Sequence, residues 1–145
     1  MNNKIASIAR QGITCIKNAA NPYFNSKYAD LATVVAALNE PLKEEHLGYR
    51  FSIESKELET NAVWSVCMWV VDMETGDEKL VASFPITTAD PQKFGSCVTY
   101  AKRYMLTTVF NVIAEEDDDG NAASAKPEKR MPSAMAPAKK EMFFN

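Results

Sequence analysis

Apolar residues recur at steps of three and four in the first twenty positions: Ile5, Ile8, Ala9, Ile13 and Ile16. This spacing predicts an amphipathic helix over the first twenty residues. The helix should end near Asn21, because Pro22 disfavours the helical conformation in the residue before it. The polar and aromatic residues 23–30 then predict a connector.

A second helical pattern begins near Ala29, with apolar residues again at steps of three and four: Leu31, Val34, Val35, Leu38 and Leu42. We expect Pro41 to kink or divide this helix, because proline lacks the amide hydrogen of a helical bond. Gly48 should end it by adopting the left-handed conformation common after helices.

The middle of the chain predicts three strands. In residues 49–58 large apolar residues alternate with polar ones, which is typical of a strand with one exposed face. Residues 62–72 are apolar on both faces, as in a central strand. Residues 80–86 predict a third strand, ended by Pro85. Short turns join the three into an antiparallel meander, and the flanking helices make this an α+β fold.

Residues 90–110 predict a third helix, with Asp90 as its N-cap and Pro91 at its first position. On a helical projection one stripe is apolar: Phe94, Val98, Ala101, Met105 and Val109. Another stripe is cationic, hydroxylated and aromatic: Lys93, Ser96, Tyr100, Arg103 and Tyr104. The second stripe suits single-stranded nucleic acid, because cations neutralise phosphates and unpaired bases stack on rings. A merely solvated helix face has a similar composition.

Charge is distributed unevenly along the chain. Residues 1–114 include 11 basic and 12 acidic side chains, whereas residues 115–145 include 5 and 7. No acid lies between Pro91 and Ala114, so the net charge of −3 does not exclude a phosphate-bearing partner. The shift to alanine, proline and charge predicts a core over 1–114, followed by an acidic boundary and flexible tail over 115–145.

The bulk features predict a cytoplasmic protein. A chain of 145 residues with 46% hydrophobic content suits one domain with a real core. No apolar run approaches membrane-spanning length, and the N-terminus lacks the apolar stretch of a signal peptide. Cys15, Cys67 and Cys97 are widely spaced and His46 is the single histidine. We therefore expect buried, reduced thiols and neither metal nor cofactor.

Catalytic motifs are absent from the sequence. It contains no glycine-rich phosphate loop, nucleophile elbow or paired-histidine metal motif. The acids Asp117 to Asp119 suggest a metal site, but a calcium loop would need a further acid at its twelfth position. Trp64 and Trp69 lie five apart in one predicted strand, so they should face opposite sides, with at least one in the core.

Three blocks of sequence resemble the Erf (essential recombination function) family of phage single-strand annealing proteins. They are KYADLATVVAALNEPLKEEHLG at 27–48, DPQKFGSCVTYAKRYMLTTVF at 90–110 and EEDDDGNA at 115–122. The first matches the family's Lys-Tyr-Ala-Asp-Leu opening and leucine-rich helix. The second matches its ordered Gln, Gly, Ser, Thr-Tyr and Arg-Tyr, and the third matches the acidic block that closes its core.

This resemblance implies a β-β-β-α core that forms an oligomeric ring or filament. It also implies binding of single-stranded DNA in a basic groove and ATP-independent annealing of complementary strands in phage homologous recombination, without enzymatic chemistry. Carried over residue by residue, it implies the following DNA-facing positions: Lys27, Tyr28, Gln92, Lys93, Ser96, Thr99, Tyr100, Lys102, Arg103 and Tyr104.

Several alternatives remain open at this level. Asp30 is expected as a first-turn acid favoured by the helix dipole, and Gly95 as a point of close helix packing. The terminal KKEMFFN, residues 139–145, has a form that docks on other proteins, here a single-strand-binding or recombination protein. The alternative functions are a metal-dependent DNA-processing enzyme that uses the acidic run at 115–119, and a structural oligomeric scaffold.

Overall fold

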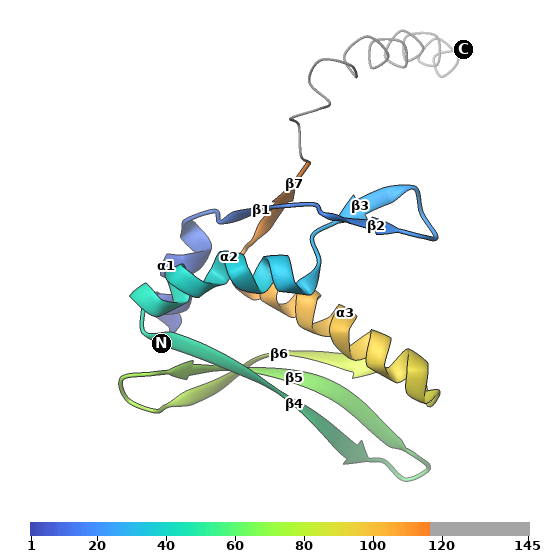
Figure 1. Ribbon diagram of the computed structural model, residues 1–145. Coiled ribbons are helices and arrows are strands. Elements are labelled where there is room, and N and C mark those ends of the chain that lie inside the picture. The colour runs from blue at the N-terminus through green and yellow to red at the C-terminus, as the bar shows by residue number, and fades with distance from the viewer. Residues whose placement is uncertain (117–145) are drawn as a thin grey trace, which may run out of the picture. The chain divides into compact units, whose positions relative to one another are not determined.

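The computed structural model describes residues 1–116. It has three helices: α1 (Asn2–Arg10), α2 (Leu31–Glu44) and α3 (Pro91–Val109). Its strands are β1 (Thr14–Ile16), β2 (Ala19–Asn21), β3 (Ser26–Tyr28), β4 (Leu47–Glu57), β5 (Ala62–Asp72), β6 (Glu78–Ile86) and β7 (Ile113–Glu115). The helices lie on one face of the sheet β4–β5–β6 (Figure 1), which confirms the predicted α+β class.

The three long strands form the predicted antiparallel meander. Phe51 of β4 pairs with Met68 of β5, and Met68 pairs with Ala82 of β6. Contrary to prediction, Pro85 does not end β6 but pairs with Ser65 inside it. β6 is an edge strand, and an edge strand tolerates a proline because one of its sides has no ladder to interrupt.

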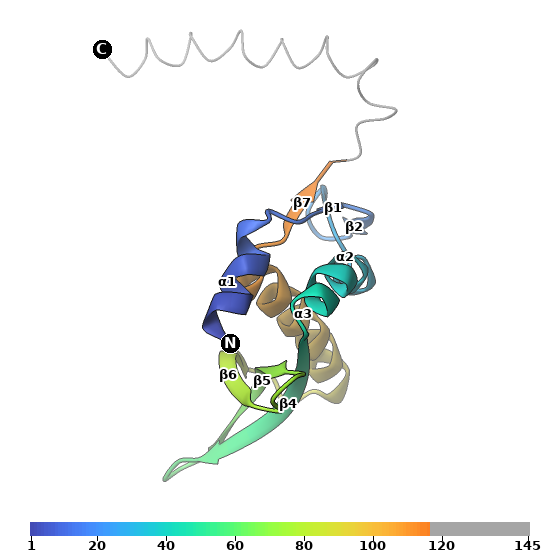
Figure 2. The ribbon, with the colours of Figure 1, turned by 90° about the vertical axis from the view of Figure 1, so that its left-hand side faces the viewer.

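The core lies between this sheet and the helices. Val66, Met68 and Val70 alternate along β5 and are fully buried on the helix side. Ala101 and Met105 of α3 are buried against them, while Phe94, Val98 and Val109 pack at the edge of the same core, so the predicted apolar stripe is confirmed. The turned view in Figure 2 shows the opposite face of the sheet without a covering element in the described part of the chain.

The first helix is shorter than its apolar spacing predicts. It ends at Arg10, and Gly12 then adopts a left-handed φ of 64° that reverses the chain direction. Residues 14–16 form β1, which pairs in parallel with β7, with Thr14 opposite Ile113. The expected connector also contains regular structure, because β2 and β3 form a short antiparallel hairpin.

Ion pairs fasten α1 to the turn between β5 and β6. Lys4 Nζ lies 3.0 Å from Asp72 Oδ2 and 2.8 Å from Glu74 Oε2. The hydrogen bond from Lys4, followed by the backbone amide of Glu74, holds the pKa of Asp72 below its ordinary value. These ion pairs attach α1 to the end of the sheet where β5 finishes.

The second helix begins and ends at residues with special roles. Asp30 lies one position before the first turn in which it was expected: it is the N-cap and accepts a hydrogen bond from the Thr33 amide at 2.8 Å. The helix is neither divided nor ended at Pro41, which lies inside it. His46, with a φ of 56°, adopts the left-handed conformation expected of Gly48. Gly48 instead lies in β4, where an added Cβ would be 2.9 Å from Met73 Sδ.

The cysteines are free thiols, and Cys15 and Cys67 are buried as expected, but Cys97 is only partly buried. Within residues 1–116, no helix is long and apolar enough to cross a membrane. The acids Asp117 to Asp119 and the terminal segment 139–145 lie outside the described residues.

Candidate nucleic-acid interface

The start of α3 fixes the direction of its polar stripe. The Asp90 carboxylate accepts hydrogen bonds from the amides of Gln92 at 2.9 Å and Lys93 at 3.4 Å. Pro91 occupies the first turn, where its missing amide hydrogen costs no helical bond. The side chains of Gln92 and Lys93 are left exposed. The Asp90 carboxylate therefore already accepts hydrogen bonds from the backbone amides at the start of α3.

Arg103 lies among three tyrosine rings. Its guanidinium carbon is 4.4 Å from the ring centre of Tyr28, 4.9 Å from that of Tyr104 and 5.5 Å from that of Tyr100. We name these four residues the Arg103 cluster. Contacts of this kind hold a planar cation by attraction to the ring faces, and they leave its N–H groups available to an acceptor such as a phosphate.

The two tyrosines of α3 also contact each other. The ring centres of Tyr100 and Tyr104 are 4.4 Å apart, and Phe84 of β6 meets Tyr100 edge-on at 6.1 Å. The pKa of the Tyr100 hydroxyl is raised, first by its hydrogen bond with Tyr104 and then by burial, while the charge of Arg103 acts in the opposite direction. Tyr100 therefore remains neutral near pH 7, and Arg103 supplies the positive charge of the cluster.

Tyr28 is held beside α3 by hydrogen bonds that join the two ends of its hairpin. Asn18 Nδ2 donates to Asp30 Oδ2 at 3.0 Å, and the Asp30 amide donates to Asn18 Oδ1 at 3.0 Å. These bonds tie the residue before β2 to Asp30, two residues after β3. The hydrogen bonds from Thr33 and then Asn18 lower the pKa of Asp30. Asp30 is thus a positioning residue that holds β3, and with it Tyr28, against α3.

Three of the predicted DNA-facing cations are in no ion pair in the described part of the chain. Within residues 1–116, Arg103 has no ion-pair partner, and neither Lys27 nor Lys93 has one. Tyr100 and Tyr104 are 47% and 42% exposed beside Arg103. A surface that combines cationic side chains outside ion pairs with exposed rings can contact both the phosphates and the bases of a single strand.

Two predicted cations lie apart from the cluster. Lys102 Nζ is 5.5 Å from the ring centre of Phe51 in β4, on a different flank of α3 from Arg103. Lys27 precedes Tyr28 in β3, and successive side chains of a strand point to opposite faces. The four clustered residues are therefore brought together, whereas Lys27 and Lys102 are not.

The predicted hydroxyl groups have partners within the helix. Ser96 Oγ donates to the Gln92 carbonyl oxygen and Thr99 Oγ1 to that of Gly95, each at 3.3 Å. In this arrangement both hydroxyls offer lone pairs outward, whereas a phosphate needs donors. They would have to rotate away from the backbone before they could bind a phosphate oxygen.

Gly95 and the tryptophans differ from expectation. An added Cβ on Gly95 would have nothing within 4 Å, so this glycine serves no close packing in the chain. Trp64 and Trp69 do lie on opposite faces, as their spacing predicts. Neither is buried, because Trp64, which is 45% exposed, borders an open hollow beside Phe94 of α3, and Trp69 lies on the uncovered face.

Two exposed aromatic residues of the β2–β3 hairpin were not among the predicted site residues. Tyr23 and Phe24 form the tip of the β2–β3 hairpin and are 87% and 69% exposed. Asn21 Oδ1 accepts hydrogen bonds from both of their amides, at 2.9 and 3.3 Å, which fixes the turn. Their signal in the sequence was two adjacent rings after Pro22 in an otherwise polar segment.

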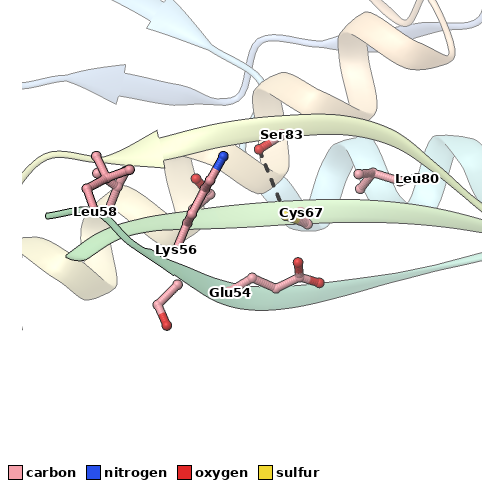
Figure 3. A pocket seen from close by; sticks show the side chains of 9 residues that line it. Glu54, Lys56, Leu58, Cys67, Leu80 and Ser83 are labelled. Carbon is pink, nitrogen blue, oxygen red and sulfur yellow. Dashed lines mark hydrogen bonds between the residues drawn. The ribbon is translucent and has the colours of Figure 1, made fainter.

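The uncovered face of the sheet has a hollow of a different character (Figure 3). It is lined in part by Glu54, Lys56, Leu58, Leu80 and Ser83. One acid and one base flank it, so it has no excess of positive charge to attract phosphate. Within residues 1–116, no group of three histidine, cysteine or acidic side chains could hold a metal ion.

Comparison with protein families gives a match over nearly the whole chain. The family model described as ERF superfamily matches residues 2–142. That range includes all of α1 to β7, and with them the Arg103 cluster. No curated protein and no solved structure matches the chain significantly.

Proposed function

The chain belongs to the ERF superfamily, and on that premise we propose that it binds single-stranded DNA and anneals complementary strands. The setting is phage homologous recombination, in a host cytoplasm. Membership of the family supports a role in recombination and annealing. Binding of an unpaired strand is supported by the chain's own surface chemistry.

The observation that carries this proposal is the Arg103 cluster. A guanidinium held over three rings keeps its charge and its N–H donors while losing little side-chain freedom on binding. The exposed Tyr100 and Tyr104 rings beside it offer faces to unpaired bases. Stacking tolerates any base, so a surface of this kind binds single strands without reading their sequence.

Annealing follows from holding a strand by its phosphates. Arg103 and Lys93 neutralise backbone charge, which lowers the repulsion that a second strand meets when it approaches. Bases that are held only by stacking can leave the rings and pair with a complement. Neither step uses a nucleophile, a metal ion or ATP, so in this proposal the protein is not an enzyme.

Self-association is part of the proposal. One chain offers few open cations to a strand, and weak contacts become strong when many linked subunits bind one polymer. β4 and β6 are edge strands, and in the described part of the chain each pairs on one side only. Such edges can join subunits into a ring or filament.

A strand-annealing assay tests the function against its alternatives. The protein is mixed with complementary labelled oligonucleotides in the presence of a chelator and without ATP, and we expect duplex to form faster than without protein. Shortening of the oligonucleotides that requires magnesium would instead indicate a nuclease. Failure to retain a single strand at low salt, with self-association intact, would indicate a scaffold.

A further inference from the structure

A second aromatic site lies beyond the start of α3. The end of the sheet and the first turn of the helix enclose a hollow of roughly 620 Å³. Trp64, Pro85 and Phe94 supply its apolar walls, and Thr87 and Thr88 supply hydroxyl groups. Figure 1 shows this place, where the start of α3 lies beside the end of β6 and the start of β5.

Trp64 differs from the chain's other tryptophan in having no described polar partner. Trp69 is covered by Arg50, whose guanidinium is 4.7 Å from the ring centre, and its Nε1 donates to Ser52 Oγ at 2.9 Å. Trp64 is 45% exposed, and within residues 1–116 its indole has neither a hydrogen bond nor a ring contact. An open indole beside a hollow is available to a flat ligand.

We propose that this hollow takes one unpaired base of a bound single strand, stacked on Trp64. The inference rests on the proposed function and adds a base site to it. An indole stacks on any base, and the hydroxyls of Thr87 and Thr88 can contact polar base edges without demanding one sequence. The walls are apolar and aromatic, which suits the flat face of a base better than a phosphate.

The hollow and the Arg103 cluster both include residues of α3. Phe94, which lines it, directly follows Lys93, whose side chain is exposed and has no ion-pair partner in the described part of the chain. From Lys93 to Arg103 the helix rises about 15 Å, at 1.5 Å per residue. A strand bound along α3 can therefore meet Arg103, Lys93 and Trp64 in succession.

The two tryptophans give the proposal a direct test. In Trp69→Phe the remaining indole is Trp64, and in Trp64→Phe it is Trp69. Each full-length variant is titrated with labelled oligothymidylate while tryptophan emission and label anisotropy are recorded together. We expect Trp64 emission to be quenched along the anisotropy curve, whereas Trp69 emission stays unchanged. Trp64→Ala should weaken binding about tenfold, and Trp64→Phe, which keeps a ring, by less.

Three outcomes would overturn the inference. If Trp69→Phe binds the oligonucleotide and Trp64 emission does not change, the base site is absent and the proposed function still stands. If Trp64 emission changes with protein concentration alone, a second copy of the chain occupies the hollow. If the wild-type protein retains no single strand at low salt, the proposed function fails and the base site fails with it.

Discussion

The guanidinium of Arg103 lies 4.4 Å from the ring centre of Tyr28, although one belongs to the long helix α3 and the other to the three-residue strand β3. This contact joins the two sequence blocks that carry most of the family resemblance. It also means that the cationic surface is made by tertiary structure and depends on whatever holds β3 in place.

The first prediction concerns that support. Asp30→Ala removes the N-cap of α2 and one of the two hydrogen bonds to Asn18, so the free energy of unfolding should fall by about 1 kcal/mol. Affinity for a single strand should fall as well, because Tyr28 loses its fixed position under Arg103. Asp30→Asn is the matched control, since its amide oxygen can still cap the helix. If Asp30→Ala and the wild type bound DNA with equal affinity, Asp30 would not contribute to the binding surface.

The second prediction concerns the tyrosine pair. In Tyr104→Phe, Tyr100 loses the hydrogen bond that chiefly raises its pKa, so this pKa should fall toward the ordinary value. The ultraviolet absorbance of the phenolates during an alkaline titration measures the change. Tyr23→Phe removes an exposed tyrosine at the hairpin tip and serves as the control. Identical curves for the two variants would mean that Tyr100 and Tyr104 are not hydrogen-bonded in solution.

The third prediction concerns Gly95. Its added methyl group meets no atom within 4 Å, and alanine favours the helical conformation. Gly95→Ala should therefore raise the free energy of unfolding by about 0.5–1 kcal/mol, measured by denaturant titration. A fall in DNA affinity in this stabilised variant would show that the strand passes close to the helix backbone here. A loss of stability would contradict the open surroundings of Gly95.

The fourth prediction concerns acid. Because the pKa of Asp72 is lowered in the folded state, its carboxylate stabilises the fold at pH values above the ordinary pKa of about 3.9. This stabilisation is lost as pH falls through the lower, folded-state pKa. In Asp72→Asn, Tm should be reduced at neutral pH and should fall less steeply below about pH 4 than in wild type. Glu40→Gln, an exposed change on α2, is the control, and its Tm should depend on pH as in the wild type. If Tm of Glu40→Gln fell as gradually below about pH 4 as that of Asp72→Asn, Asp72 would not explain the effect.

The sequence predicted the elements that depend on interactions between residues close in the chain. Asp90 and Pro91 mark the start of α3 because capping and the missing amide act within one turn. The meander was predictable because alternation and turns fix its strands. The end of α1 was missed, although Gly12 was a stop signal, because apolar spacing continues through Ile13 and Ile16.

The parts that escaped prediction depend on distant pairings. β1 and β7 are short and pair across almost the whole described chain, so no periodicity announces them. The approach of Tyr28 to Arg103 follows from the Asn18 and Asp30 bracket, which only the folded chain reveals. Sequence reasoning therefore named the residues of the cluster among others, without separating them from Lys27 and Lys102.

The most direct test of the Arg103 cluster is the salt dependence of single-strand binding in a charge variant. Arg103→Met removes the cation, and Arg10→Met makes the same change in the last turn of α1. Label anisotropy gives the dissociation constant over a series of salt concentrations, with circular dichroism as a check on the fold. We expect Arg103→Met to bind more weakly and to lower the slope of log affinity against log salt by about 0.7, with Arg10→Met unchanged. A folded Arg103→Met protein with wild-type affinity and slope would contradict the account.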